Sequence, residues 1–203
     1  MKEIVLEWFI CAIAAAVLMI VHELSKAIVY MGIQKARGNK RKYTHSIWEV
    51  HRYLDPVGII LAITSSVAFS KPFMFRIQDK KVNRILGITG FAVLLACFAG
   101  SAMALKMHLF GVSGMATLEN QGDLAKIITL FIQYIAILSF GMLVTNLFPV
   151  STFDMGLLIA GASAQKYLGI IKMDAVIKMI FVVAVFTDLI SYGGYRFLAL
   201  ILR

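Results

Sequence analysis

Residues 4–31 read IVLEWFICAIAAAVLMIVHELSKAIVYM, an apolar run that is long enough to cross a bilayer as one helix. About 20 helical residues span the ~30 Å hydrocarbon layer. Near its downstream end the run contains His22, Glu23 and Lys26. Ionisable side chains at membrane depth are costly, so they indicate a functional site by default. The stretch therefore predicts a membrane-spanning helix that carries a polar site.

The composition of the whole chain agrees with a membrane protein. Of the 203 residues, 60% are hydrophobic and only 15% are charged, whereas soluble domains carry about 25% charged residues. No polar linker is long enough to separate two units. We therefore expect a single membrane-embedded domain over residues 1–203, with an all-α polytopic fold.

Four segments are predicted to span the membrane, at about residues 4–31, 85–105, 124–148 and 175–202. A fifth apolar stretch, residues 57–69, has only 13 residues. That length is short for a crossing helix and typical of a re-entrant or interfacial segment. The expected fold has about four transmembrane helices plus this short segment.

The net charge of +9 comes from basic residues dispersed through short loops. This distribution is typical of the positive-inside bias and of contact with anionic lipid headgroups, and it argues against nucleic-acid binding. The loops over residues 35–52 and 71–84 are both strongly basic. If residues 57–69 enter the membrane and return, both loops share the cytoplasmic face, and the amino terminus lies outside. We expect a bacterial plasma membrane location.

This topology brings two distant stretches to the same depth near the cytoplasmic face. His22 lies near the cytoplasmic end of the first span, and Asp154 follows the cytoplasmic end of the third. Pro149 lies between that third span and Asp154, and proline interrupts a helix because it lacks a backbone donor. Non-helical backbone at membrane depth requires surrounding protein or a water-filled cavity. Asp154 could therefore bind a cation or proton there, or act only as a helix N-cap.

The run His22-Glu23-Leu24-Ser25-Lys26 is close to H-E-x-x-H, in which two histidines hold zinc and the glutamate acts as general base. Downstream come His51 to Gly58, with its Asp-Pro pair, then Lys71-Pro72, Gly100 to Ala104, and Asn146 to Gly156. In order and spacing these stretches resemble the site-2 protease family of intramembrane zinc metalloproteases, over about residues 15–160. The family cleaves transmembrane helices of other proteins.

The resemblance implies a role for each matching residue. His22 matches the first zinc ligand, Asp154 matches the carboxylate ligand, and Glu23 matches the base that activates zinc-bound water. Asn146 matches a residue that contacts substrate backbone. Pro149 matches the break that exposes the site. A site-2-protease-like core, a zinc cofactor and a transmembrane-helix substrate would follow.

The chain departs from the family pattern at several functional positions. Lys26 replaces the second histidine ligand, Ala104 replaces a polar residue, Met155 separates Asp154 from Gly156, and Ser70 replaces an alanine. Lys26 matters most, because an ammonium has no lone pair to donate and catalytic zinc normally keeps three protein ligands. We hypothesise that Lys26 takes the electrostatic place of zinc between Glu23 and Asp154.

A missing ligand could instead come from another histidine: His45, His51 or His108. Three functions follow from these alternatives. The first is a catalytically impaired or inactive family member that binds or regulates membrane-helix partners, with no zinc. The second is an active intramembrane zinc protease. The third is a small transporter that uses His22, Glu23 and Asp154 as a proton or ion path.

Overall fold

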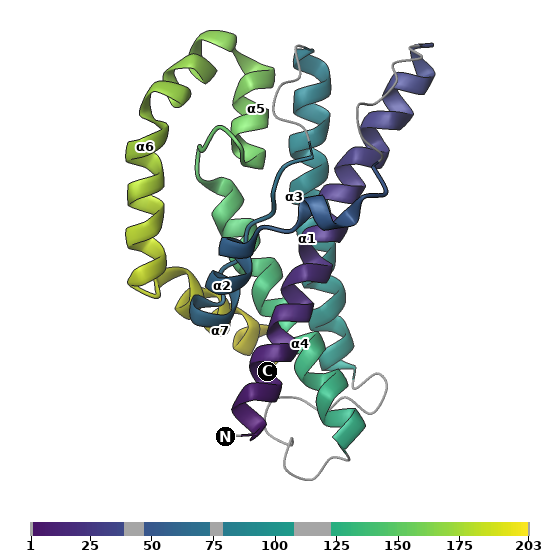
Figure 1. Cartoon of the computed structure of the whole chain (residues 1–203), viewed down its shortest axis with the longest axis vertical. Coiled ribbons are helices and arrows are strands. Elements are labelled where there is room, and N and C mark those ends of the chain that lie inside the picture. Colours follow the sequence, from purple (N-terminus) through teal and green to yellow (C-terminus); the bar gives the residue numbers. More distant parts are fainter. Residues whose placement is uncertain (1, 39–46, 74–78, 108–122, 203) are drawn as a thin grey trace.

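The structure, a computed structural model, describes residues 2–38, 47–73, 79–107 and 123–202, and all regular elements in these ranges are helical (Figure 1). This confirms the all-α expectation for the described residues. In chain order the elements are α1 (Lys2–Ala36), the 3₁₀ turn η1 (Val50–Tyr53), α2 (Pro56–Ser65), α3 (Lys80–Lys106), α4 (Asp123–Leu147), α5 (Asp154–Ala162), α6 (Ala164–Phe186) and α7 (Leu189–Leu202).

Within the described ranges, three helices are long and apolar enough to cross a membrane: α1, α3 and α4. They correspond to the first three predicted spans and pack against one another. The chain is therefore a membrane protein whose described residues form helices as their only regular structure. Figure 1 shows these three helices side by side, with α5 and α6 forming an arch beside them.

The segment 175–202, which we expected to cross as one helix, is divided between two helices. The helix α6 ends at Phe186, and α7 begins at Leu189. Between them Asp188 adopts a left-handed backbone conformation with φ of 52°, which turns the chain out of the α6 axis. The α6 sequence also carries Lys172, Asp174 and Lys178.

The short apolar segment around α2 begins and ends at the same end of the helix bundle. Arg37, just after α1, forms an ion pair with Asp79, just before α3. Closer to α2, the Lys71 amide donates to the Tyr53 carbonyl at 3.0 Å, so the chain returns beside its own entry. That residues 57–69 do not cross the membrane stays a prediction.

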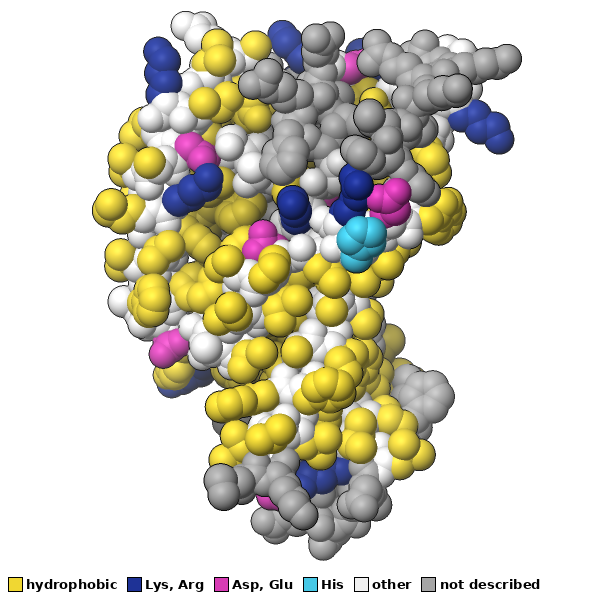
Figure 2. All heavy atoms as spheres, viewed as in Figure 1, with side chains coloured by type: hydrophobic (Ala, Val, Ile, Leu, Met, Phe, Trp, Pro, Cys, Tyr) yellow, Lys and Arg dark blue, Asp and Glu magenta, His cyan; other side chains and the backbone are white. Residues whose placement is uncertain are grey.

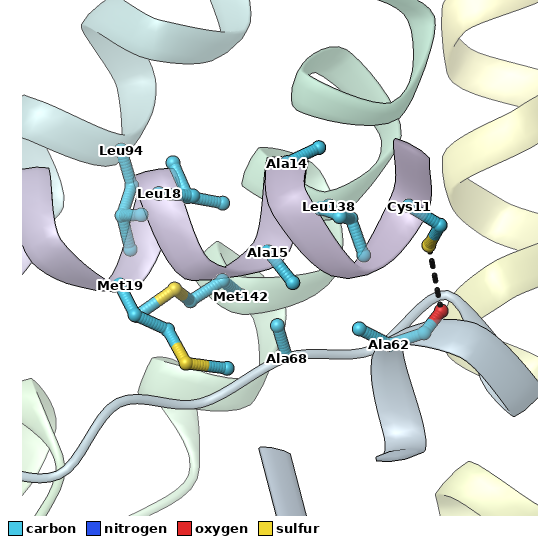
Figure 3. Packing of buried hydrophobic residues seen from close by; sticks show 10 residues of the cluster. All are labelled: Cys11, Ala14, Ala15, Leu18, Met19, Ala62, Ala68, Leu94, Leu138 and Met142. Atoms are coloured by element: carbon cyan, nitrogen blue, oxygen red, sulfur yellow. Dashed lines mark hydrogen bonds between the residues drawn. The ribbon is translucent and has the colours of Figure 1, made fainter. Parts of the chain in front are cut away.

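A core of small and large apolar side chains holds α1, α2, α4 and the chain after α2 together (Figure 3). Ala14 and Ala15 on α1 are fully buried, and their small size lets the neighbouring backbones approach closely. Leu138 and Met142 of α4 fill the adjacent space. This core ends at Leu18 and Met19, one turn before the polar residues of α1. It therefore fixes the depth and rotation of α1 at the site.

The visible face of the molecule is divided by side-chain type (Figure 2). Hydrophobic side chains cover most of its middle and lower part, and several Lys and Arg side chains gather in its upper part. The upper end is where α1 ends, α3 begins and α5 joins α6 (Figure 1). There the guanidinium of Arg84 donates to the Gly161 carbonyl at 2.9 Å. The basic end and the apolar flank are the two surfaces that a membrane-embedded bundle presents.

Candidate functional site

Three ionisable residues of α1 lie on one side of the helix and are almost completely buried. His22, Glu23 and Lys26 are only 1%, 1% and 2% exposed. Residues three or four positions apart share a helix face, so Lys26 lies one turn beyond both neighbours. Burying charged groups is costly unless they are paired. The burial therefore requires a compensating partner from elsewhere in the chain.

Asp154, the first residue of α5, supplies that partner and is itself 0% exposed. Its Oδ2 lies 2.7 Å from His22 Nε2, and its Oδ1 lies 2.9 Å from Lys26 Nζ. Lys26 Nζ also lies 2.7 Å from Glu23 Oε1. The lysine thus bridges the two carboxylates. We refer to His22, Glu23, Lys26 and Asp154 as the ion quartet.

Ser70, in the extended chain after α2, completes the hydrogen bonding on the other side of His22. Its hydroxyl donates to Glu23 Oε1 at 2.7 Å, and its Oγ lies 3.0 Å from His22 Nδ1. The Phe73 amide donates to Glu23 Oε2 at 3.1 Å. Both ring nitrogens of His22 therefore lie within hydrogen-bond distance of oxygen atoms, and which nitrogen donates depends on the tautomer of the ring.

The break after α4 places Asp154 in the quartet. The helix ends at Leu147, Pro149 follows, and the chain turns before α5 begins. Asn146 holds this turn, because its Oδ1 accepts from the Asp154 amide at 3.2 Å and its Nδ2 donates to the Met142 carbonyl at 2.9 Å. Phe153, not Asp154, is the N-cap of α5. The carboxylate is therefore free of a capping role and points to α1.

The helix α3 contributes space for the quartet. A Cβ atom at Gly90 would overlap the Asp154 carboxylate, and one at Gly87 would lie 2.9 Å from the Asp154 backbone oxygen. Only glycine at position 90 lets the carboxylate reach His22 and Lys26 in this position. The polar site is thus closed by α1, by α5, by the chain after α2, and by the bare backbone of α3.

The side chains present do not fit a catalytic zinc ion. Such an ion normally takes three protein ligands plus a water. Here His22 Nε2 and Lys26 Nζ both bond Asp154, and the ammonium offers no lone pair. Among the described residues, no group of three His, Cys, Asp or Glu could hold a metal ion. His51 is exposed, and the other two candidate rescuing residues, His45 and His108, lie outside the described ranges.

The structure brings together most of the residues singled out in the sequence and adds two more. His22, Glu23, Lys26 and Asp154 are in direct contact, and Asn146 bonds the Asp154 backbone. Sequence reasoning missed the contributions of Ser70 and Gly90. Ser70 was noted only as a departure from an alanine. No local sequence signal identifies it, because its partners Glu23 and His22 lie 47 and 48 positions away in the chain.

No protein-family model, curated protein or solved structure matches this chain. The side chains of the site itself determine which chemistry is available there. Two carboxylates and two nitrogen groups contact one another in a cluster that is almost completely buried. Such a closed set stabilises one arrangement of α1 against α5. To act as base, Glu23 would have to release both Lys26 and Ser70.

Proposed function

We propose that this chain is a site-2-protease-like membrane protein that binds or regulates membrane-helix partners and has lost, or nearly lost, hydrolytic activity. Lys26 stands where the family's second zinc-ligating histidine would stand. In this proposal the old catalytic residues His22, Glu23 and Asp154 have become a structural ion cluster. In this proposal Asn146 and Pro149, which match the substrate-contacting residue and the helix break of the family, lie where a partner helix would bind.

One observation carries the proposal: Lys26 Nζ lies within 2.9 Å of Asp154 Oδ1 and within 2.7 Å of Glu23 Oε1. These are the carboxylates that the resemblance assigns to zinc ligation and to proton transfer. A tethered ammonium between them supplies the positive charge that would otherwise come from the metal ion. It cannot polarise a bound water as a Lewis acid does.

The charges of the pocket support the same conclusion. A zinc ion with a neutral histidine would bring two positive charges to Glu23 and Asp154. A doubly protonated His22 together with Lys26 brings the same total from side chains alone. Replacing one partner of a buried ion pair is strongly destabilising, because the remaining charge is left uncompensated. The Lys26 substitution is therefore tolerated because it restores the balance.

The proposed orientation follows from the basic end of the bundle. The positive-inside bias places Lys35, Lys80 and Lys166 on the cytoplasmic side. The amino terminus of α1 then lies outside, and the ion quartet lies nearer the cytoplasmic face. A partner would approach laterally from the bilayer, which covers the apolar flank seen in Figure 2.

Metal content tests the proposal directly. We expect wild-type protein, purified in mild detergent with added zinc, to hold much less than one zinc per chain by elemental analysis. The Lys26→His variant should bind zinc, because it restores a third nitrogen or oxygen ligand beside His22 and Asp154. One tightly bound zinc per wild-type chain would contradict the proposal.

Proteolysis tests it independently. A single-span membrane protein, co-reconstituted with the wild-type chain, should remain intact over the time in which an active intramembrane protease cleaves its substrate. In Glu23→Gln protein whose folding is verified by its helix content, binding of a membrane helix should be unchanged. Cleavage that disappears in Glu23→Gln would instead establish the active zinc protease.

A further inference from the structure

The first turns of α3 carry three basic side chains that no acidic group compensates. Lys80, Lys81 and Arg84 are all exposed. Asp79, directly before them, is already engaged, because it caps α3 and forms an ion pair with Arg37. Within the described part of the chain, none of the three cations has an ion-pair partner. The start of α3 therefore presents an uncompensated positive charge.

Arg84 differs from the two lysines because its side chain has a fixed orientation. Its Nε donates to the Gly161 carbonyl at 2.9 Å. A Cβ atom at Gly161 would overlap Arg84 Cγ, so the aliphatic part of the arginine lies directly against the bare backbone at the end of α5. The two terminal Nη groups have no partner among the described residues. They form a planar fork that matches two oxygens of a phosphate group.

The cations at the opposite end of the bundle are engaged by the protein itself. Lys106, in the last turn of α3, donates to the Ile201 carbonyl at 2.9 Å. Lys126, near the start of α4, pairs with Glu3. In the ranges that the structure describes, the unpaired cations of α3 thus lie at its first turns and not at its last. An external anion would be attracted to the end that carries Arg84.

An exposed apolar stripe continues along α3 from these basic turns. Residues three, four or seven positions apart share a helix face, which places Ile88 in line with Lys81 and Arg84, and Leu95 in line with Ile88. Ile88 is 60% exposed and Leu95 is 58% exposed. Since α3 is long and apolar enough to cross the membrane, this face has cations at its end and apolar side chains at the depth of the acyl chains. A phospholipid has the same order of charge and hydrocarbon, whereas a soluble anion would use only the cations.

We propose that the first turns of α3 bind the headgroup of an anionic phospholipid. Arg84 holds the phosphate with its fork, and Lys80 and Lys81 favour a headgroup with net negative charge over a zwitterionic one. The acyl chains of the lipid lie along Ile88 and Leu95. This inference does not depend on the proposed loss of hydrolytic activity.

A local lipid site differs from the general attraction between a basic surface and an anionic membrane. General attraction acts on every exposed cation, including Lys71 in the chain after α2. A held lipid depends on the residues of α3 that face it and on the fork of Arg84. Variants that remove one charge on α3 or one charge elsewhere therefore distinguish the two cases.

The test measures which lipid lies beside α3 in the reconstituted full-length chain. A single tryptophan is placed by Ile88→Trp, one turn from Arg84, in a background of Trp8→Phe and Trp48→Phe. The vesicles contain phosphatidylcholine and phosphatidylglycerol, and either lipid carries brominated acyl chains, which quench a neighbouring tryptophan. Comparing the two labelling schemes gives the binding constant of phosphatidylglycerol relative to phosphatidylcholine at this position.

We expect phosphatidylglycerol to be preferred about fivefold at Ile88→Trp, the factor that one basic side chain near the membrane surface contributes. Arg84→Gln should abolish the preference, and Arg84→Lys, which keeps the charge but loses the fork, should retain only part of it. Lys71→Gln should leave it unchanged. A tryptophan placed instead by Met103→Trp, at the other end of α3, should report equal binding of the two lipids.

Lys81→Gln guards against a folding defect in Arg84→Gln. The Lys81 side chain has no hydrogen-bond partner among the described residues, so its removal should lower the preference without disturbing the packing. Equal binding of both lipids at Ile88→Trp would overturn the site. Equal decreases in Arg84→Gln and Lys71→Gln would overturn it in favour of general attraction. Displacement of the brominated lipid by glycerol phosphate would show that the site binds a soluble phosphate, and would overturn the lipid assignment.

Discussion

At the scale of single residues, Lys26 is the one member of the ion quartet whose side chain pairs with both Glu23 and Asp154 through its ammonium group. It is the link between two buried carboxylates that come from helices far apart in the chain. Its ammonium lies between the two carboxylates and forms an ion cluster with them.

Replacing Lys26 with methionine should therefore destabilise the protein strongly. The change leaves Glu23 and Asp154 buried without the ammonium that pairs with both, and we expect a loss of about 3–5 kcal/mol in the free energy of unfolding. Chemical unfolding in mild detergent measures it. Lys178→Met is the control, since its pair with Asp174 is half exposed and such pairs contribute at most about 1 kcal/mol. Equal losses in the two variants would refute a central role for Lys26.

Ser70→Ala should cost less, but still more than a surface hydroxyl. The change removes the donor to Glu23 and the acceptor beside His22, and an unsatisfied buried partner costs about 1–3 kcal/mol. Thr64→Ala on the exposed side of α2 is the matched control, with an expected change within about 0.5 kcal/mol. The same unfolding experiment compares them. No difference between the two would show that Glu23 and His22 find other partners.

The sequence predicted the residues of the site better than their contacts. His22, Glu23 and Asp154 could be identified because the H-E pair and the Asn146-to-Asp154 spacing are local patterns. Ser70 could not, because its role depends on a return of the chain after α2 that brings residues 48 positions apart into contact. Gly90 could not, because its absent Cβ matters only once α5 lies against α3.

At the scale of helices, α3 illustrates how a missing side chain shapes the site. Gly90→Ala should push the Asp154 carboxylate out of the quartet, with an expected loss of about 1–3 kcal/mol from overpacking. Gly100→Ala on the same helix has nothing within 4 Å of the added carbon. It should be neutral or stabilise the helix by up to about 1 kcal/mol. Thermal unfolding of both variants checks this contrast, and a stable Gly90→Ala protein would refute it.

The junction of α1 and α3 should give the protein a pH dependence outside the membrane. The hydrogen bond from Arg37 lowers the pKa of the Asp79 carboxyl, helped by the Val82 amide at the start of α3. A lowered folded-state pKa means that the stabilisation is present above the unfolded pKa of about 3.9 and is lost as pH falls through the folded value. Asp79→Asn should therefore be less stable than wild type at neutral pH and equally stable in strong acid. Unfolding curves across this pH range measure the difference, and a gap that persists in strong acid would contradict the assignment.

Helix positions were predictable where hydropathy alone decides them. The runs at 4–31, 85–105 and 124–148 became α1, α3 and α4, because long apolar stretches leave few alternatives in a bilayer. The run at 175–202 carries Lys178, Asp188 and Arg196, and it is divided at Asp188. The mean hydropathy of a segment does not depend on the backbone conformation of a single residue. A hydropathy average along the sequence therefore does not predict a left-handed turn.

At the scale of the whole molecule, two ion pairs mark opposite ends of the bundle. Lys126 binds Glu3 where α4 and α1 begin, and Arg37 binds Asp79 where α1 ends and α3 begins. The two ends differ in charge, with Lys35, Lys80 and Lys81 near the second. The positions of the basic residues along the sequence predicted this asymmetry. The arch of α5 and α6 depends instead on contacts between distant residues, which a local sequence pattern does not predict.

The orientation of the bundle is checked with a membrane-impermeant maleimide on intact cells. In a chain with Cys11 and Cys97 replaced by alanine, we expect Glu3→Cys to react from outside. Lys80→Cys should react only after permeabilisation, because basic loops stay in the cytoplasm. The reverse pattern would invert the proposed topology and place the ion quartet near the outer face.

The contact between Lys26 and Asp154 joins positions 128 residues apart, which has a consequence for how the chain is made. When α1 first enters the bilayer, Asp154 has not yet been synthesised, so Lys26 and His22 have only Glu23 as a carboxylate neighbour. The first helix therefore completes its charge balance late, when α5 arrives. Nascent chains that end before α5 should be poorly retained in the bilayer and open to quality-control proteases, whereas chains that include it should persist.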